Sequence, residues 1–466
     1  MQIQILNGIY SNSSADLRNS YPVNLIPVPK ENGASKGYLR PADGISLFGT
    51  GPGVDRGGIS WNGVCYRVMG TKLVSIASDG TTTTLGDVGG STQATLDYSF
   101  DRLAICSNGD LFYWDGATLT QVTDVDLGTS IDVLWVDGYF MSTDGTSLIV
   151  TELNAPTTIN PLKYGSSEVD PDPVKGLFKL RNEVYALNRN TIEVFDNIGG
   201  SLFPFQRIEG AQIQKGVLGT HCATVFVDTI AFLGSGRNEA PAIYLGANGG
   251  TTKISTREID QILEGYTEAQ LALTVMETRI AKGLSLLYLH LPDQTLVYDS
   301  AASLALQEAV WFVLTSSLTG LSQYMAKNFV WCYGKWLAGD PTSSNHGYLV
   351  DTIATHYENH VRLEFGTLIT YNESRSAIFH ELELVCLTGR VAFGLDPTIS
   401  TSYSVDGMTW SQDKFTKVGM QGDRTKRIFW LQCGLLGNFR MQRFRWDTQA
   451  FISVLRLEAR LEALAN

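Results

Sequence analysis

The feature that most constrains this chain is a strand–turn–strand unit that recurs up to about residue 350. In the copy SFDRLAICSNGDLFYWDG (99–116), two apolar runs flank Asn108-Gly109, a dipeptide typical of a tight hairpin because both residues accept positive φ. One hairpin cannot bury both of its faces, whereas sheets packed around an axis bury them against one another. The recurrence therefore predicts a β-propeller. The copies occupy residues 61–76, 99–116, 135–153, 177–197, 225–249, 281–300 and 325–352.

The spacing of these units limits the number of blades to a narrow range. Their starts lie irregularly, about 35 to 55 residues apart, near the period of a four-stranded blade. We therefore expect six or seven blades, with the N-terminal segment or the last hairpin completing a blade closed by both ends of the chain. Within 99–116, Leu111 with Tyr113 and Phe112 with Trp114 are expected to supply alternate faces of one strand.

The flanks of the repeat differ from it and divide the chain into three parts. Residues 1–50 are rich in proline and turn glycines, which predicts an extended arm, short of internal hydrogen bonds, that lies against its own body or a neighbouring subunit. Residues 51–352 hold the propeller. Residues 353–466 alternate apolar and polar side chains over longer strands, which predicts a C-terminal β-sandwich-like domain. The predicted fold class is all-β.

A short helical insertion is expected near residues 255–275. Ile259, Ile262 and Leu263 recur at helical spacing, and Gly265 is expected to end that helix. Thr267 followed three residues later by glutamine has the pattern of a capping box for a second helix.

Composition narrows the function. The formal charge is −12, so the chain is a poor candidate for gripping duplex DNA, although a polyanion can slide past it. The six cysteines are scattered without C-x-x-C spacing, which predicts reduced, buried thiols in a reducing compartment. No apolar run has the length of a transmembrane helix, and the first residues lack the pattern of a secretory signal.

Motifs that would carry catalysis or metal binding are incomplete. The aspartates of 99–116 lack EF-hand spacing, and HYENH (356–360) lacks the second-position glutamate of H-E-x-x-H. SYSVDGMTWS (402–411) is similar to the Asp-box hairpin of sialidase propellers, but its Asp and Gly are adjacent. Nucleophile-elbow and phosphate-loop patterns do not occur. We expect no enzymatic activity, no catalytic residues, no metal site and no cofactor.

One region reverses the overall charge. From Lys417 to Arg460 the chain has nine Lys or Arg and three Asp or Glu, interleaved with aromatic residues. Arginine and aromatic side chains are enriched at protein interfaces, so we predict a partner interface, with solvated strand charges and nucleic-acid contact as the alternatives. The predicted interface residues are Arg424, Lys426, Arg427, Arg440, Arg443 and Arg445.

Several stretches, in order along the first 300 residues, resemble a known family. They are YPVN (21–24), GYLR (37–40) with Gly44-Ile45, YRVMGTKL (66–73), IQKGVLGTHC (213–222), YTEAQLALTVMET (266–278) and LYLHLPDQTLVYD (287–299). Together they resemble the tail-hub or nozzle protein of short-tailed bacteriophages (podoviruses), also called the packaged-DNA stabilisation protein.

The resemblance implies a structural protein of the virion tail, made and assembled in the host cytoplasm. It implies a homo-oligomer, a hexameric ring below the portal and the head–tail adaptor protein that extends the DNA channel and helps to retain packaged DNA. Further implied partners are a tailspike or tail fibre and a needle or plug protein, while genomic DNA passes through the ring without tight binding. The alternative is a glycan-binding or glycan-cleaving propeller of a phage tail.

Overall fold

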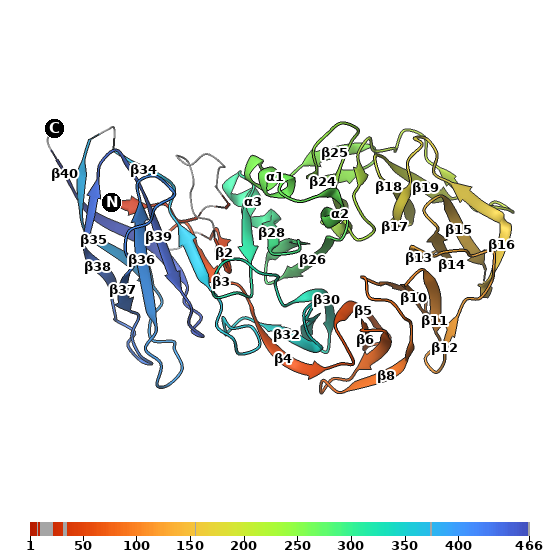
Figure 1. Ribbon diagram of the computed structural model, residues 1–466, viewed down its shortest axis with the longest axis horizontal. Helices are drawn as coiled ribbons and strands as arrows, with labels where there is room; N and C mark the ends of the chain where they lie inside the picture. The colour runs from red at the N-terminus through yellow and green to blue at the C-terminus, as the bar shows by residue number, and fades with distance from the viewer. Residues whose placement is uncertain (7, 10–21, 31–34, 154, 373–374, 465–466) are drawn as a thin grey trace.

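The computed structural model describes the whole chain except residues 7, 10–21, 31–34, 154, 373–374 and 465–466. Within this part the strands form nine sheets. Seven of them are arranged in a ring, and the other two pack together as a second domain beside it (Figure 1). The all-β class, the propeller and the C-terminal sandwich are confirmed, and the described residues form seven blades.

Four antiparallel strands build each of the first four blades. Blade 1 has β5 (Asp55–Trp61), β6 (Val64–Met69), β7 (Lys72–Ile76) and β8 (Thr82–Asp87). Blade 2 has β9 (Thr95–Tyr98), β10 (Leu103–Ser107), β11 (Asp110–Trp114) and β12 (Leu119–Gln121). Blade 3 has β13 (Asp132–Val136), β14 (Tyr139–Thr143), β15 (Ser147–Glu152) and β16 (Ala155–Ser166). Blade 4 has β17 (Val174–Leu180), β18 (Glu183–Asn188), β19 (Ile192–Asn197) and β20 (Phe205–Arg207).

The remaining blades complete the ring. Blade 5 has β21 (Gly216–Val217), β22 (Ala223–Phe226), β23 (Thr229–Ser235), β24 (Ala242–Ala247) and β25 (Gly250–Lys253). Blade 6 has β26 (Val275–Ala281), β27 (Leu284–His290), β28 (Thr295–Asp299) and β29 (Trp311–Leu314). Blade 7 has β30 (Lys327–Cys332), β31 (Lys335–Gly339), β32 (Asn345–Val350) and, as its outer strand, β4 (Gly44–Thr50). Because β4 precedes blade 1 in sequence, the N-terminal segment closes the ring, which is one of the two alternatives that the sequence left open.

The hairpin at 107–110 shows how a blade is buried on both faces. Asn108 and Gly109 have φ of 59° and 85° and join β10 to β11 with Ser107 opposite Asp110. Phe112 and Trp114 pack with side chains of blade 1, whereas Leu111 and Tyr113 pack with those of blade 3. The predicted alternation of faces is confirmed.

Two short helices lie between blades 5 and 6, as expected. Ile259 and Leu263 of α1 (Arg257–Glu264) are buried, and the backbone N–H of Gly265 donates to the last turn. Thr267 and Gln270 form the predicted capping box of α2 (Glu268–Leu271). A further helix, α3 (Ser300–Leu306), begins after Asp299, whose carboxylate accepts hydrogen bonds from two backbone N–H groups, and it was not predicted.

The second domain is a sandwich of two sheets around an apolar core. The first sheet runs β2 (Leu25–Val28), β3 (Tyr38–Pro41), β40 (Val454–Ala463), β35 (Ala377–Cys386) and β38 (Ile428–Leu436), with β1 (Gln2–Ile3) also paired to β40. The second runs β33 (Leu363–Gly366), β39 (Phe439–Trp446), β36 (Thr398–Ser404) and β37 (Lys414–Lys417), with β34 (Thr370–Tyr371) also paired to β39.

The N-terminal segment belongs to both domains. Strands β1, β2 and β3 are part of the sandwich, β4 is part of blade 7, and β2 and β3 pair with each other. The expectation that this arm is short of internal hydrogen bonds is therefore wrong for 25–28 and 38–41, because each proline removes only its own N–H and the other residues of the two strands still pair.

Asn24 fixes the junction between the two domains. Its Nδ2 donates to the carbonyl oxygens of Thr315 (2.9 Å) and Arg362 (2.8 Å), and its Oδ1 accepts from the Thr315 N–H at 3.0 Å. Thr315 follows the outer strand of blade 6, and Arg362 leads into β33 of the sandwich. Asn24 has a φ of 53°, a backbone conformation that asparagine tolerates better than most residues. In this conformation its side chain forms hydrogen bonds with both domains.

The described helices are all too short to cross a bilayer. All six cysteines are free; five are buried and Cys386 is partly buried.

Candidate partner interface

The basic residues of the C-terminal region divide between two sheets. Arg440, Arg443 and Arg445 lie on β39, where successive side chains point to opposite faces. Arg443 and Arg445 are partly exposed on the outer face, but Arg440 points between the sheets and is only 1% exposed. Arg440 therefore cannot contact a partner at the surface, in contrast to the prediction made for it.

Arg443 and Arg445 are held by neighbours on their own face. The guanidinium of Arg443 lies 4.0 Å from the ring centre of Trp410 and donates to the Ser402 hydroxyl. Arg445 Nε donates to Glu364 at 2.8 Å. These contacts partly offset the charge of both cations and hold their side chains in place. Arg443 and Arg445 therefore form an ordered, partly exposed surface.

Arg424, Lys426 and Arg427 lie in the loop before β38, and all three are exposed. Arg427 Nε donates to Glu383 at 2.8 Å, and the same guanidinium lies over Phe429. Because β38 belongs to the first sheet and β39 to the second, the structure does not gather the six predicted residues into one patch.

Four exposed apolar side chains lie on β37 and β38, the two strands that flank the loop with the exposed cations. Phe415, Phe429, Leu431 and Leu435 are 68%, 39%, 58% and 47% exposed. The two strands are adjacent, since the Thr416 hydroxyl donates to the Phe429 carbonyl. We call Arg424, Lys426, Arg427 and these four apolar residues the β37–β38 face. Apolar area rimmed by cations is typical of protein contact sites.

Three of the other interleaved aromatic residues belong to the core. Trp430, Phe444 and Trp446 are at most 4% exposed and pack between the two sheets. Phe429 is exposed, whereas these three aromatic residues point between the sheets. The sequence pattern of basic and aromatic residues does not distinguish a surface aromatic residue from a core one.

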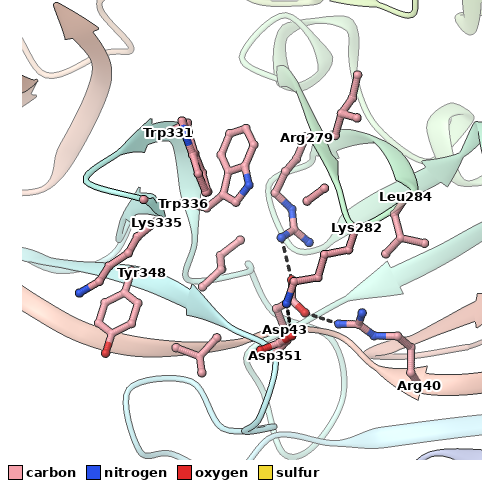
Figure 2. A pocket seen from close by; sticks show the side chains of 15 residues that line it. Arg40, Asp43, Arg279, Lys282, Leu284, Trp331, Lys335, Trp336, Tyr348 and Asp351 are labelled. Atoms are coloured by element: carbon pink, nitrogen blue, oxygen red, sulfur yellow. Dashed lines mark hydrogen bonds and ion pairs between the residues drawn. The ribbon is translucent and has the colours of Figure 1, made fainter. Parts of the chain in front are cut away.

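A second site is a pocket of about 690 Å³ between blades 6 and 7, beside the end of β3. Figure 2 shows two tryptophans on one side and a cluster of charged side chains on the other. The rings of Trp331 and Trp336 are 5.3 Å apart, and Trp331 is 55% exposed. Lys335 lies over the ring of Tyr348 at 4.5 Å.

The charged side of this pocket is internally paired. Asp43 accepts from Arg40 and, at 2.7 Å, from Arg279, and Lys282 pairs with Asp351. Burial opposes the charge of Arg279, but Tyr288 and Asp43 outweigh it and raise its pKa above the ordinary arginine value. No residue of this pocket was singled out from sequence, because blades 6 and 7 and the end of β3 meet there only in the fold.

The incomplete motifs have structural roles. Asp406 accepts hydrogen bonds from the Thr409 hydroxyl and from the backbone N–H groups of Thr409 and Met408, which lower the pKa of its carboxyl. This Asp-box-like turn follows a strand of the sandwich. His356 is buried and hydrogen-bonded to Ser316, whereas His360 is exposed. Among the described residues no group of three or more His, Cys, Asp or Glu could hold a metal ion.

Comparison with known proteins decides the family. Residues 1–354 match the family described as bacteriophage P22 Gp10, β-propeller, and residues 362–462 match bacteriophage P22 Gp10, β-sandwich. The chain belongs to the P22 Gp10 family. A full-length relative, the tail hub protein gp10 of Salmonella phage P22, is 28% identical over 486 residues, covering 99% of each chain.

Family membership confirms a structural tail hub protein of the phage virion, in the family associated with DNA stabilisation, rather than an enzyme. Among solved structures, the N-terminal domain of Nup159 has a TM-score of 0.42 at 9% identity, covering 69% of this chain and 97% of its own. The Neurospora crassa Pan2 WD40 domain has a TM-score of 0.43 at 9% identity, covering 66% of this chain and 95% of its own. These two likenesses are too weak to support a functional argument.

Proposed function

We propose that this tail hub protein forms a hexameric ring below the portal and the head–tail adaptor, extends the DNA channel and helps to retain the packaged genome. The observation that carries the proposal is the full-length similarity to the P22 tail hub protein, which spans propeller and sandwich alike. The net charge of −12 supports a conduit that DNA crosses without tight binding, because few phosphates can be neutralised.

The β37–β38 face is the part of the sandwich that we propose as a docking surface for tail partners: the adaptor, a tailspike or tail fibre, or a needle or plug protein. Its exposed cations and apolar side chains match the composition of protein interfaces. Arg443 and Arg445 extend the proposal to the second sheet, and Arg440 is left out because it is buried.

Electron microscopy of the purified protein with its adaptor tests the ring. A sixfold ring joined to the adaptor is the expected result. A monomer or trimer that leaves the adaptor free would contradict the proposal.

Charge reversal tests the β37–β38 face. Arg424→Glu with Lys426→Glu is expected to reduce assembly of infectious tails, measured as tail occupancy and DNA retention of purified particles. Arg257→Glu is the matched control, since Arg257 is an exposed cation on α1, in the propeller. Equal assembly of all three proteins would contradict the interface.

A glycan-binding role is the second candidate, supported by the pocket of Figure 2. The exposed Trp331 and the partly buried Trp336, beside paired charged groups, suit the apolar faces and hydroxyls of a sugar ring. Isothermal titration with host surface polysaccharide should give binding that Trp331→Ala abolishes. Equal heats for both proteins would contradict this role.

A further inference from the structure

Arg440 is a buried cation without a matching anion among the described residues. Its side chain crosses the sandwich core, and its guanidinium lies between the rings of Phe379 (4.3 Å) and Tyr403 (3.9 Å). No described Asp or Glu forms an ion pair with it. A buried charge of this kind is costly unless it is paired and fully hydrogen-bonded.

Two of the three guanidinium nitrogens of Arg440 are satisfied within the chain. Nε and Nη2 donate to Gln442 Oε1 at 3.1 and 2.8 Å, and Nη2 also donates to the Cys433 carbonyl at 2.6 Å. Gln442 is held in turn by a bond from its Nε2 to the Thr401 hydroxyl. Nη1 is buried and has no hydrogen-bond partner among the described residues. These hydrogen bonds hold the guanidinium in one orientation and leave only Nη1 without an acceptor in the part of the chain that the structure describes.

Arg440 lines a pocket of about 190 Å³. The buried hydroxyl of Thr401 and the buried amide of Gln442 line its inner part, and the exposed residues Gln412, Lys414 and Gln432 bring it to the surface. The described lining includes two cations, Arg440 and Lys414, and no carboxylate.

The backbone beside the pocket departs from regular strand geometry. β38 has an irregular register opposite β35 between Leu431 and Gly434, and Gln432 there has a φ of 53°. Gln432 is neither Gly nor Asn, so this conformation costs conformational energy. Such bulges are over-represented beside functional sites, and this one contains Cys433, whose carbonyl oxygen bonds Arg440.

We infer that this pocket binds a small oxyanion, a phosphate or a carboxylate, between Arg440 at its floor and Lys414 at its rim. Burial lowers the pKa of Arg440 to about 10, so the guanidinium is charged at neutral pH and available to an anion. The oxyanion comes either from a free phosphate or from the carboxylate of an acidic side chain on a tail partner. The inference does not depend on the ring or on the β37–β38 face.

The test uses the full-length protein with inorganic phosphate and with acetate, each at the ionic strength of a chloride reference. A saturable rise in Tm is expected, because a ligand that binds the native state stabilises it by mass action. A response to phosphate alone identifies a phosphate site, and a response to acetate alone identifies a carboxylate site. A Tm that responds to neither beyond the chloride reference would overturn the inference.

Two variants locate the binding. Arg440→Met should weaken affinity about 10- to 100-fold, the effect of one charge-assisted hydrogen bond. If Arg440→Met does not fold, Lys414→Gln removes the exposed rim cation and should weaken affinity several-fold, while Lys417→Gln on the same strand, outside the pocket, should not. Equal affinity of wild type, Lys414→Gln and any folded Arg440 variant would place the anion elsewhere and overturn the inference.

Discussion

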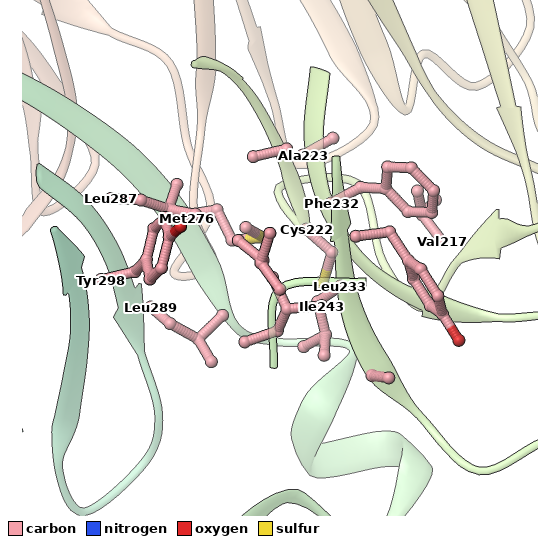
Figure 3. Close-up of a cluster of buried hydrophobic side chains, with 14 of the residues drawn as sticks. Val217, Cys222, Ala223, Phe232, Leu233, Ile243, Met276, Leu287, Leu289 and Tyr298 are labelled. Carbon is pink, nitrogen blue, oxygen red and sulfur yellow. The ribbon is translucent and has the colours of Figure 1, made fainter. Parts of the chain in front are cut away.

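Two joints of the propeller differ in how much buried polar chemistry they contain. Between blades 5 and 6 the contact is apolar, and Figure 3 shows Leu233 and Ile243 on the side of Leu287 and Leu289. Cys222 lies in the same cluster, where burial raises the pKa of its thiol to about 12. This joint is held by packing and by the removal of apolar surface from water.

Where blades 6, 7 and 1 meet, the apolar packing is accompanied by a buried polar network. Arg67 of blade 1 pairs with Asp55 at 2.7 Å, and both side chains are fully buried. Asn328 of blade 7 bonds both, giving its carbonyl to Arg67 and its Nδ2 to Asp55 at 2.6 Å. Glu277 of blade 6 accepts the backbone N–H of Asn328 and pairs with His290 at 2.6 Å.

The difference follows from what each joint must achieve. Blades 5 and 6 are consecutive, so the chain itself brings their apolar faces together. Blade 1 meets blade 7 only when residues 55–67 and 328 find each other across the whole propeller. Apolar packing tolerates small shifts, whereas the directional bonds of Arg67, Asp55 and Asn328 accept one register.

The largest effect is expected from breaking the polar joint. Arg67→Met leaves Asp55 buried without its cation and should lower the free energy of unfolding by about 3–5 kcal/mol. Urea denaturation measures the change. The double variant Asp55→Leu with Arg67→Met should recover most of it, and a single variant within 1 kcal/mol of wild type, on the order of a surface pair, would refute the polar account.

A smaller loss is expected at the apolar joint. Leu289→Ala should cost about 3 kcal/mol through lost burial and the cavity that remains. Leu304→Ala is the control, since that leucine is 83% exposed on α3 and should change little. Similar midpoints for both variants would mean that the joint does not depend on packing.

The stability contributed by the polar joint should depend on pH, whereas that of the apolar joint should not. Burial raises the pKa of Glu277, but bonds from His290, Phe329 and Asn328 outweigh it and hold the pKa below the ordinary value. Its stabilisation is therefore complete above the unfolded-state pKa and is lost as pH falls through the folded one. Glu277→Gln should cost about 1.5–3 kcal/mol at neutral pH and less in acid. Urea midpoints at neutral pH and at a pH well below the ordinary glutamate pKa measure this, and Leu289→Ala should lose the same amount at both. A constant deficit for Glu277→Gln would contradict the assignment.

The smallest change probes the edge of the polar joint. Gln93 donates to Asn328 Oδ1 at 2.6 Å from a half-buried position. Gln93→Ala should cost about 0.5–1.5 kcal/mol, because water can replace much of one neutral hydrogen bond. A loss of stability as large as that of Arg67→Met would show that the hydrogen bond from Gln93 is as important to the polar network as the buried ion pair.

Much of the fold is predictable because its signals are local. Asn108-Gly109 sets its own turn, and the alternation of Leu111 and Phe112 follows from the strand period of two. The capping box at Thr267 is likewise a matter of four consecutive residues. α3 escaped prediction because its N-cap, Asp299, directly ends a buried strand and so reads as part of it.

The candidate sites were less predictable. The sequence marks Arg440, Arg443 and Arg445 as one basic run, but strand alternation places Arg440 in the core. The pocket of Figure 2 assembles Arg40, Arg279 and Trp331 from three separate segments, and no spacing in the sequence relates them.

The sequence by itself determined the all-β propeller, its hairpin turns, its two small helices and a sandwich after it, since each depends on periodicity and turn chemistry within a few residues. Only the tertiary structure decided that β4 closes a seventh blade, that β1 to β3 complete the sandwich, and that Arg440 is buried beside a pocket. Those outcomes depend on pairing between segments hundreds of residues apart, such as Gln2 with Glu458 and Gly44 with Val350. Such long-range pairing is set by which exposed edges and apolar faces remain to be covered, and local pattern does not encode it.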